Sequence, residues 1–538
     1  MSKASSIASI DGALQSLGGL KWGKANFIRI MLFCVVLILL ILAFLLLEAG
    51  AVGVAKIVLG ASMIITTVFV PPKYLIYAVI VYFPFESMII KLLPQSLVPI
   101  VRYGVEVVLV IALMALLFRR RMRGLSFIPA IDLPIALFLC AGILSALVNQ
   151  VPATYALLGL RAFFRFIPLY LLIVNAKLTR DDIRRITTLL IMIAFIEVLI
   201  GISQSMFGSS FSNFFLPSKQ AVLVGDTQVD VGTSGQWASD KFHVFGTLPR
   251  YNDFGEFSAL FSLLCAGLYY SKLKDLKRIV LLFMPIGLIA ILLSSSRTAL
   301  ISLAVGMLVI TFLAKAKKTF LALLAVVISL SLVVVLLWSA VVSLPTVNMS
   351  GEQSEQNVFS RMAQSVNPEK LQPEYNSNFR LFLIEDVGQR ILTNWPFFGM
   401  GIGTFGSALS KAEQSSFYRD LGISENWLRW VADVEFVTIF GQTGIFGLLA
   451  FLILLFGVFL GAVSLIKRTD DPLISGLSLA TAGIIAAMLV FCLTSAFFEK
   501  RHFTIYFWLF AGIIAIFSNM LSDSRRIENQ KNKFLHER

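Results

Sequence analysis

Residues 378–405 read NFRLFLIEDVGQRILTNWPFFGMGIGTF, and residues 427–449 read WLRWVADVEFVTIFGQTGIFGLL. The first stretch belongs to a long polar insertion between two apolar segments, and the second ends inside the next apolar segment. Arg380, Asp433 and Glu435 thus lie close to a membrane boundary, where charged side chains are costly and usually have a partner or a task. This part of the sequence predicts a membrane-embedded fold with a charged site at its edge.

The composition is typical of a polytopic, all-α membrane protein. Of the 538 residues 57% are hydrophobic and 14% are charged, and many apolar runs reach the roughly 20 residues that a helix needs to cross a bilayer. The net charge of +14 comes from short basic clusters between these runs, a pattern that orients a membrane protein and does not indicate nucleic-acid binding. The cysteines lie inside apolar runs, so neither a disulfide framework nor a metal site is predicted. They are Cys34, Cys140, Cys265 and Cys492.

About fourteen transmembrane helices are predicted, and basic clusters in every second loop place both termini in the cytoplasm. The two long loops, at about 209–251 and 343–435, then face outward. The predicted spans are at about 28–48, 51–70, 74–93, 98–118, 131–149, 154–176, 186–208, 252–271, 279–295, 298–314, 319–342, 436–466, 473–496 and 503–521.

The chain divides into five parts on this topology. The large outward loop is too long for an idle connection and contains helical patterns at 380–392 and after Ser424, so we expect a partly helical cap on the membrane surface. The parts are a cytoplasmic segment at 1–27, a bundle of about eleven helices at 28–342, the loop at 343–435, C-terminal membrane helices at 436–521 and a cytoplasmic tail at 522–538.

Several charges are expected inside the membrane. Arg161 and Arg165 lie one turn apart in the sixth span without an evident acidic partner, which predicts a polar cavity that holds an anion. Internal ion pairs account for the acidic residues: Arg102 with Glu106, one turn apart, and Glu86 with an arginine from another span. Pro84 and Glu86 are also expected to interrupt the third span.

Basic residues gather at the outward rim with few acids beside them. Such side chains often only anchor a helix at the interface, but Arg297, in SSSRTAL between two short spans, has little room to do so. Guanidinium groups bind phosphate in a bidentate fork, so a cationic cavity bounded by lipid suits a substrate with a lipid tail and a pyrophosphate. The rim residues are Arg250, Arg297, Arg361, Arg380, Arg390, Arg429, Lys500 and Arg501.

No cofactor or metal is predicted. Gly399, Gly401 and Gly403 form a GxGxG pattern, but no strand precedes it, so a tight turn beside the bilayer is expected instead of a dinucleotide site. The histidines have no metal partner at helical spacing; they are His243, His502 and His536.

Four stretches together resemble the O-antigen ligase/polymerase superfamily, whose members are membrane glycosyltransferases. They are GTLPRYNDFGEFS at 246–258, SSSRTAL at 294–300, the block with R, P and GxGTF at 380–405, and DVEFVTIFGQTGIFGLL at 433–449. The ligases of this superfamily usually carry histidine where this chain has Asp433, whereas its polymerases more often carry an acid there.

The resemblance implies a bundle of the lipid-linked-sugar glycosyltransferase type in a bacterial inner membrane, acting on undecaprenyl-pyrophosphate-linked glycans as donor and acceptor. Membrane lipids are partners, and a chain-length regulator and a flippase of the same pathway are further expected ones. A polymerase of repeat units is the first hypothesis, a ligase of finished glycan the second, and a lipid-linked oligosaccharide flippase the alternative from another class.

The motifs also suggest a division of roles among the charged residues. Asp433 or Glu435 is the expected base for the acceptor hydroxyl, with Asp433 favoured. If one helix runs unbroken from Ser424, the two acids point to different sides, and Asp433 has Arg429 one turn away as a salt-bridge partner. The expected pyrophosphate and glycan ligands are Arg297, Arg380, Arg250, Arg161, Arg165 and Arg429.

Overall fold

The computed structural model describes most of the predicted membrane bundle and the second half of the large loop. The described residues are 51–119, 125–216, 221–224, 227–230, 244–271, 273, 275–323, 379–413 and 416–536. The predicted span at 28–48, most of the span at 319–342, the segment 1–27, Arg361 and His243 lie outside these residues.

The described chain is helical apart from one short antiparallel hairpin, in which β1 (Ala221–Val224) pairs with β2 (Thr227–Asp230). A 3₁₀ turn, η1, covers Gln95–Leu97. The bundle helices are α3 (Val52–Phe69), α4 (Pro72–Leu92), α5 (Val98–Arg119), α6 (Pro129–Val148), α7 (Ala153–Phe164), α8 (Ile167–Asn175), α9 (Arg180–Phe215), α10 (Tyr251–Tyr270), α11 (Lys277–Leu293), α12 (Arg297–Leu313), α20 (Glu435–Arg468), α21 (Pro472–Phe491) and α22 (Arg501–His536).

These helices make the protein a multi-pass membrane protein. Eight described helices are long and apolar enough to cross a membrane, or nine if α7 and α8, which meet at a 40° bend, form one span. Each of the predicted spans between 51 and 314, and each of those after 436, coincides with a described helix or with the bent pair. The total of fourteen, the outward side and the cytoplasmic termini remain predictions.

Helices α10 and α21 form the centre of the bundle. Most residues of both are buried, and α10 packs against α11, α12 and α21. Small residues allow this close packing: a Cβ on Gly267 would lie 2.4 Å from the backbone nitrogen of Ala480, and one on Gly306 would lie 2.8 Å from the Gly483 carbonyl oxygen. Close backbone approach at small residues is a general device of membrane helices, because lipid leaves packing as the main attraction between them.

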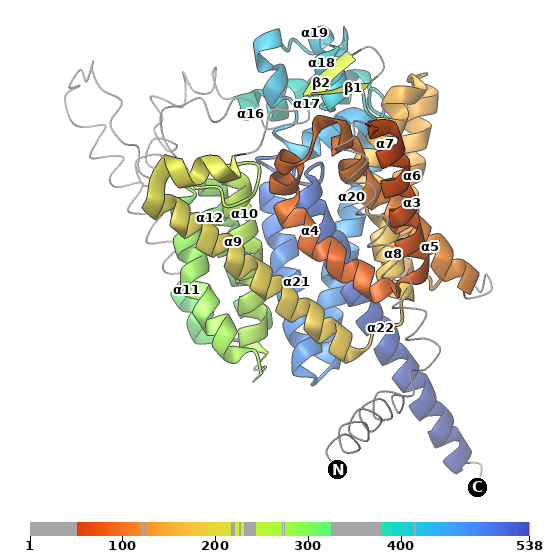
Figure 1. Cartoon of the computed structure of the whole chain (residues 1–538). Helices are drawn as coiled ribbons and strands as arrows, with labels where there is room; N and C mark the ends of the chain where they lie inside the picture. The colour runs from red at the N-terminus through yellow and green to blue at the C-terminus, as the bar shows by residue number, and fades with distance from the viewer. Residues whose placement is uncertain are drawn as a thin grey trace, which may run out of the picture.

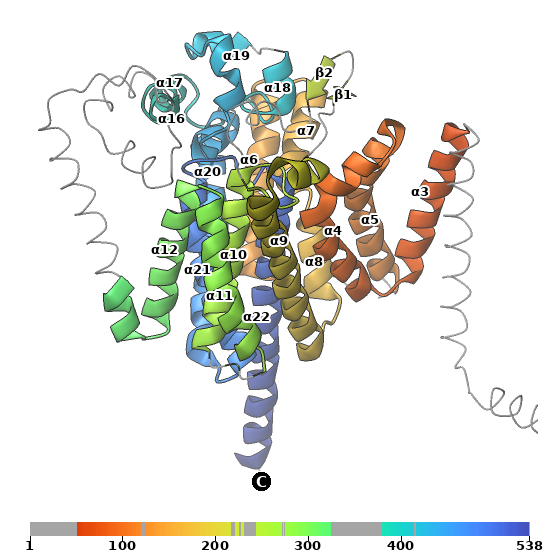
Figure 2. The ribbon, with the colours of Figure 1, turned by 60° about the vertical axis from the view of Figure 1, so that its left-hand side comes forward.

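The second half of the large loop forms a helical cap at one end of the bundle, where the β1–β2 hairpin also lies (Figure 1, Figure 2). The cap has its own apolar core, which includes Leu383, Val387, Phe405 and Leu421. The expectation of a partly helical loop is thus confirmed. Its elements are α16 (Phe379–Phe382), the π-helical η2 (Leu383–Val387), α17 (Gly388–Asn394), α18 (Ala408–Ala412), α19 (Ser416–Asp420) and the 3₁₀ turn η3 (Glu425–Trp430).

Two local expectations are wrong. The α-helix expected after Ser424 is only the turn η3, whose start the Ser424 side chain does not cap, and the chain breaks before α20 begins. Pro84 does not interrupt α4, which continues as one helix through Leu92. The carbonyl of Pro84 accepts a hydrogen bond from the Thr247 hydroxyl at 2.9 Å, which ties this part of α4 to the segment before α10.

The glycine pattern forms a tight turn, as expected. Gly399, Gly401 and Gly403 all have positive φ, and the turn packs against α20 where Gly444 (φ 65°) kinks that helix. Met400 donates its N–H to the Gly441 carbonyl at 2.7 Å, and Gly403 donates to the side-chain oxygen of Gln442 at 2.8 Å. Residues 378–405 and 427–449 are therefore held together at the base of the cap.

Candidate active site

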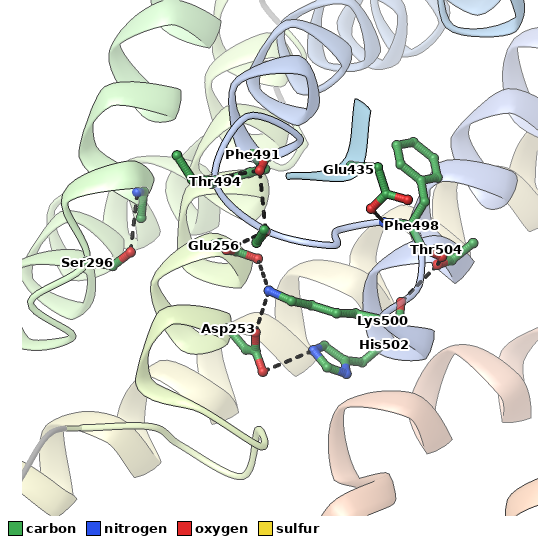
Figure 3. Close-up of polar contacts among 12 residues, drawn as sticks. Asp253, Glu256, Ser296, Glu435, Phe491, Thr494, Phe498, Lys500, His502 and Thr504 are labelled. Atoms are coloured by element: carbon green, nitrogen blue, oxygen red, sulfur yellow. Dashed lines mark hydrogen bonds and ion pairs between the residues drawn. The ribbon is translucent and has the colours of Figure 1, made fainter. Parts of the chain in front are cut away.

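The turn between α21 and α22 carries a lysine, only 16% exposed, that joins the last helix to the centre of the bundle. Lys500 lies 2.7 Å from a carboxylate oxygen of Asp253 and 2.9 Å from one of Glu256, both on α10 (Figure 3). His502 approaches the other oxygen of Asp253 at 3.5 Å. Burial lowers the pKa of the Lys500 ammonium, but the two carboxylates more than offset this, so its pKa is raised.

A second set of ion pairs, the Arg501 network, links four helices. Arg501 lies 2.8 Å from Glu86 and 3.7 Å from Glu106. The Glu106 carboxylate also accepts hydrogen bonds from both Nε and Nη2 of Arg161, at 2.6 and 2.7 Å. The guanidinium of Arg161 is therefore already bound in a bidentate fork.

The Arg501 network corrects three expectations from sequence and confirms one. Arg161 has an acidic partner, Glu106 is neutralised from other helices and not through a pair with Arg102 alone, and Arg501 is flanked by acids. The pairing of Glu86 with an arginine from another span is confirmed. Helical spacing reveals only partners within one helix, whereas these partners come from α4, α5, α7 and α22.

Arg165 follows α7 at the bend before α8. Its Nη2 donates to the backbone carbonyl of Glu499 at 2.7 Å, and its Nε donates to that of Ala162 at 3.0 Å. The side chain therefore reaches the same turn that carries Lys500, although the sequence assigned it only to a membrane cavity.

Glu435 is fully buried at the first turn of α20. Its carboxylate accepts the backbone N–H of Phe498 at 3.0 Å (Figure 3). Its own N–H donates to the carbonyl of Cys492 at 2.9 Å. Its other carboxylate oxygen has no hydrogen-bond partner among the described residues. Glu435 thus attaches α20 to the turn between α21 and α22.

Asp433 lies at the edge of the cap, in the short break between η3 and α20. Its carboxylate lies 3.1 Å from Nη2 of Arg380, on α16. The exposed fractions are 43% for the Arg380 side chain and 21% for that of Asp433, so the pair can be reached from solvent. The expectation that Arg380 has no acid nearby is wrong, and so is the helical geometry that related Asp433 to Glu435 and Arg429.

Burial raises the pKa of the Asp433 carboxyl, while the positive charges of Arg380, Arg250 and Lys500 act in the opposite direction. The cap and the Lys500 turn therefore meet at this carboxyl. Arg250 is the residue before α10, which explains how a motif far from the cap in sequence influences Asp433.

Two further charges at the same place were missed by the sequence analysis. Burial lowers the pKa of Lys411, on α18, and the Arg250 charge adds to this, although Glu499 and Asp433 oppose it. Burial raises the pKa of Glu499, against the charges of Lys411 and Arg165. The run EKRH at 499–502 between two apolar segments was the signal that could have revealed Glu499.

Arg297 is the first residue of α12 and is exposed. The preceding Ser296 caps this helix by accepting the N–H of Ala299 at 3.4 Å. The same turn packs on α10, because a Cβ on Gly255 would lie 2.6 Å from the Ser294 hydroxyl. Arg297 is therefore one residue from the turn that contacts α10 beside Glu256.

The described residues contain no group of three or more His, Cys, Asp or Glu side chains that could hold a metal ion. Cys140, Cys265 and Cys492 are free thiols.

Apolar spanning helices, a helical cap and a buried charged site beneath it define a multi-pass membrane protein with the features of an enzyme. Residues 280–452 match the family model described as O-antigen ligase, which places this part of the chain in the O-antigen ligase/polymerase superfamily and confirms the resemblance. No curated protein matches the chain. The family indicates a membrane glycan-processing enzyme, of glycosyltransferase type, that acts on lipid-linked glycans.

The matched region covers less than half of the chain. It contains α12, the cap and the first half of α20, and thus Arg297, Arg380, Asp433 and Glu435. Arg250, Asp253 and Lys500 lie outside it, although Lys500 and Arg250 act on the Asp433 carboxyl.

Proposed function

We propose that the protein polymerises undecaprenyl-pyrophosphate-linked oligosaccharide repeats into O-antigen, capsule or exopolysaccharide at the outer face of a bacterial inner membrane. The observation that carries the proposal is the solvent-accessible pair of Asp433 and Arg380 at the edge of the cap, within the region that matches the family. A carboxylate and a guanidinium at one point supply the base and the cation that glycosyl transfer from a pyrophosphate needs.

In the proposed reaction the Asp433 carboxylate removes the proton from an acceptor sugar hydroxyl. The hydroxyl oxygen forms a bond to the anomeric carbon of the donor glycan, and the bond from that carbon to the pyrophosphate oxygen breaks. Undecaprenyl pyrophosphate leaves with the electron pair, and the proton stays on Asp433 until solvent takes it. The raised pKa of Asp433 suits this role, because a base with a pKa nearer the working pH accepts a proton more readily.

Arg380 and Arg250 are the proposed ligands of the pyrophosphate, and Arg297 is a further one. Positive charge near the departing oxygens stabilises the transition state more than the ground state, because negative charge develops there. Arg161 and Arg165 are weaker candidates, since binding an anion would draw Arg161 away from Glu106 and Arg165 from the Glu499 carbonyl. Arg429, in η3 shortly before Asp433, is a further proposed ligand.

Ligation of a finished glycan to a lipid or protein is the second candidate, because the matching model is described as O-antigen ligase. The acid at Asp433, where ligases of the superfamily usually carry histidine, favours polymerisation. A chain-length regulator and a flippase of the same pathway are proposed partners of a polymerase.

The deciding experiment is deletion of the gene followed by sizing of the surface glycan and of the lipid-linked pool. A polymerase predicts single repeats on the cell surface and loss of long chains. Long chains that remain on undecaprenyl pyrophosphate would identify a ligase, and repeats retained on the inner leaflet would identify a flippase. Complementation with wild-type protein, compared with the Asp433→Asn variant, assigns the effect to this site.

A further inference from the structure

A groove of about 1050 Å³ runs between α4 and α9, away from the cap. Its polar end is lined by Tyr77, Asp181, Arg184 and Arg185. Its other end is lined by apolar side chains, which include Phe85, Ile89, Leu189 and Met192. The groove is therefore amphipathic along its length.

The polarity follows from the way the two helices run. Both lead away from the basic ends at Lys73 and Arg180, so charged residues of α9 lie level with Tyr77 and apolar ones lie level with Phe85. Between Tyr77 and Ile89 the groove extends along α4 for about 18 Å at the helical rise of 1.5 Å per residue, close to the roughly 15 Å thickness of one hydrocarbon leaflet. A single acyl chain matches this length.

The hydroxyls nearest the apolar end are bonded to other groups of the protein, and that of Thr188 donates to the Arg184 carbonyl at 3.0 Å. Tyr82 lines the groove, but its hydroxyl lies 3.3 Å from Glu86 and 3.3 Å from the Val101 carbonyl, inside the bundle. Its ring is thus left as part of the wall. Met192, with 55% exposure, and Val81, with 39%, open this end toward the surrounding lipid.

The charged end lies at the opposite end of the bundle from the cap. Arg180 binds Asp471, just before α21, at 2.6 Å, and α20 reaches that end after starting beneath the cap at Glu435. A pyrophosphate bound beside Asp433 cannot also contact Arg184 and Arg185, because the length of α20 separates the two places. The groove is a site separate from the proposed active site.

We propose that this groove binds an anionic phospholipid of the bilayer, with its phosphodiester headgroup on Arg184 and Arg185 and one acyl chain along α4 and α9. Two guanidinium groups at a leaflet boundary attract anionic headgroups, and basic pockets between membrane helices on the cytoplasmic side are a known form of such sites. On the predicted orientation this end faces the cytoplasm, so the lipid comes from the inner leaflet. The inference does not depend on the proposed glycosyl transfer.

Neighbouring acids weaken the attraction without cancelling it. Arg184 lies 3.0 Å from Asp275, but the two side chains are 43% and 53% exposed, so the pair is screened by solvent and gives way readily. Asp181 also lines the groove. Each arginine near an anionic headgroup favours binding about fivefold, so two arginines set an upper limit of about 25-fold, which the acids lower.

The test uses the full-length protein, delipidated in detergent and mixed with equal amounts of phosphatidylglycerol and phosphatidylcholine that carry the same acyl chains. Native mass spectrometry counts the lipids retained. We expect a preference for phosphatidylglycerol of between about fivefold and about 25-fold, and loss of the preference in the Arg184→Gln/Arg185→Gln variant. The matched control is Lys467→Gln/Arg468→Gln, two exposed basic residues at the same end of the bundle but on α20, which should keep the preference.

A second pair of variants tests the acyl chain. Ala78→Phe fills the groove and should lower retention of phosphatidylglycerol, whereas Ala136→Phe, at an exposed position of α6, should leave it unchanged. Equal retention of both lipids by the wild-type protein, or an unchanged preference in the double arginine variant, would overturn the proposal. So would displacement of the retained lipid by undecaprenyl phosphate at equal concentration, because the groove would then serve the polyprenyl substrate.

Discussion

The Arg501 network and the pair of Asp433 and Arg380 lie near the same end of the bundle, but they differ in exposure. Arg501, Glu86 and Glu106 are 6%, 11% and 13% exposed, and each charge faces an opposite one. Arg380 is 43% exposed and Asp433 21%. Arg501 with its two acids is therefore closed to a competing ligand, and only Arg161 in this network is more exposed, at 32%, whereas the pair of Asp433 and Arg380 remains accessible.

This difference separates charges that hold helices together from charges that are available for chemistry. A buried ion pair has already lost its water, so removal of one partner leaves the other unsatisfied and destabilises the protein. A partly exposed pair contributes little to stability, so its charges can be engaged by a ligand at a small cost to the fold. Variants on the two sets should therefore fail in different ways.

The largest effect is expected at Asp433. The Asp433→Asn variant keeps the shape of the side chain but cannot accept a proton, so polymer formation should fall by about 10² to 10⁴-fold while the amount of folded protein is unchanged. Product length on gels and size-exclusion profiles measure the two quantities. Asp420→Asn, at an exposed position of the same cap, is the control. Full-length polymer from Asp433→Asn would exclude this residue as the base.

Arg501→Gln should reduce the stability of the fold, which Asp433→Asn leaves unchanged. It leaves Glu86 and Glu106 without the Arg501 charge, which for a buried pair costs about 3–5 kcal/mol of stability. We expect less folded protein and a lower thermal unfolding temperature in detergent, with Arg390→Gln on the exposed cap as the unaffected control. Normal stability combined with lost activity would show that Arg501 serves the reaction and not the stability of the fold.

Arg380→Lys tests whether the accessible arginine acts as a fork or only as a charge. Lysine keeps the charge but not the bidentate geometry that matches a pyrophosphate, so kcat/KM should fall about 10 to 100-fold at normal protein level. The same exchange at Arg390 should have no effect. Wild-type kinetics from Arg380→Lys would exclude bidentate binding of the pyrophosphate by Arg380.

Glu435→Gln should be milder than Asp433→Asn. The glutamine amide oxygen can still accept the N–H of Phe498, so the contact between α20 and the α21–α22 turn is kept, and we expect less than about tenfold loss of activity. The two variants are compared in the same polymer assay. If Glu435→Gln makes no polymer and Asp433→Asn makes the normal amount, Glu435 is the base.

The smallest effect is on the pH profile. Since burial raises the pKa of Asp433 and only its deprotonated form can act as base, activity should disappear as the pH falls through a value above the ordinary aspartate pKa of about 4. Arg380 opposes this rise, so any activity left in Arg380→Gln should disappear at a higher pH than in the wild type. Arg390→Gln should not move the acid limb. An acid limb that stays in place in Arg380→Gln would contradict this coupling.

The sequence by itself determined the membrane helices and the importance of its opening stretch. In lipid every backbone polar group needs an internal partner, so an apolar run of sufficient length must become a helix, and its position can be read directly from the residues. The tight turn at Gly399–Gly403 was also predictable, because glycine tolerates the positive φ that the turn requires. Arg380, Arg250 and Asp433 were identified from their motifs before any contact between them was known.

Only the tertiary structure decided which charges neutralise one another. Glu106 meets Arg161 and Arg501, from α7 and α22, and Asp433 meets Arg380 across the cap. Spacing along one helix cannot reveal such partners, since they depend on how helices far apart in the chain pack together. The same packing buried Lys500 between Asp253 and Glu256, and it separated a closed network from an accessible pair that the sequence had placed in a single basic rim.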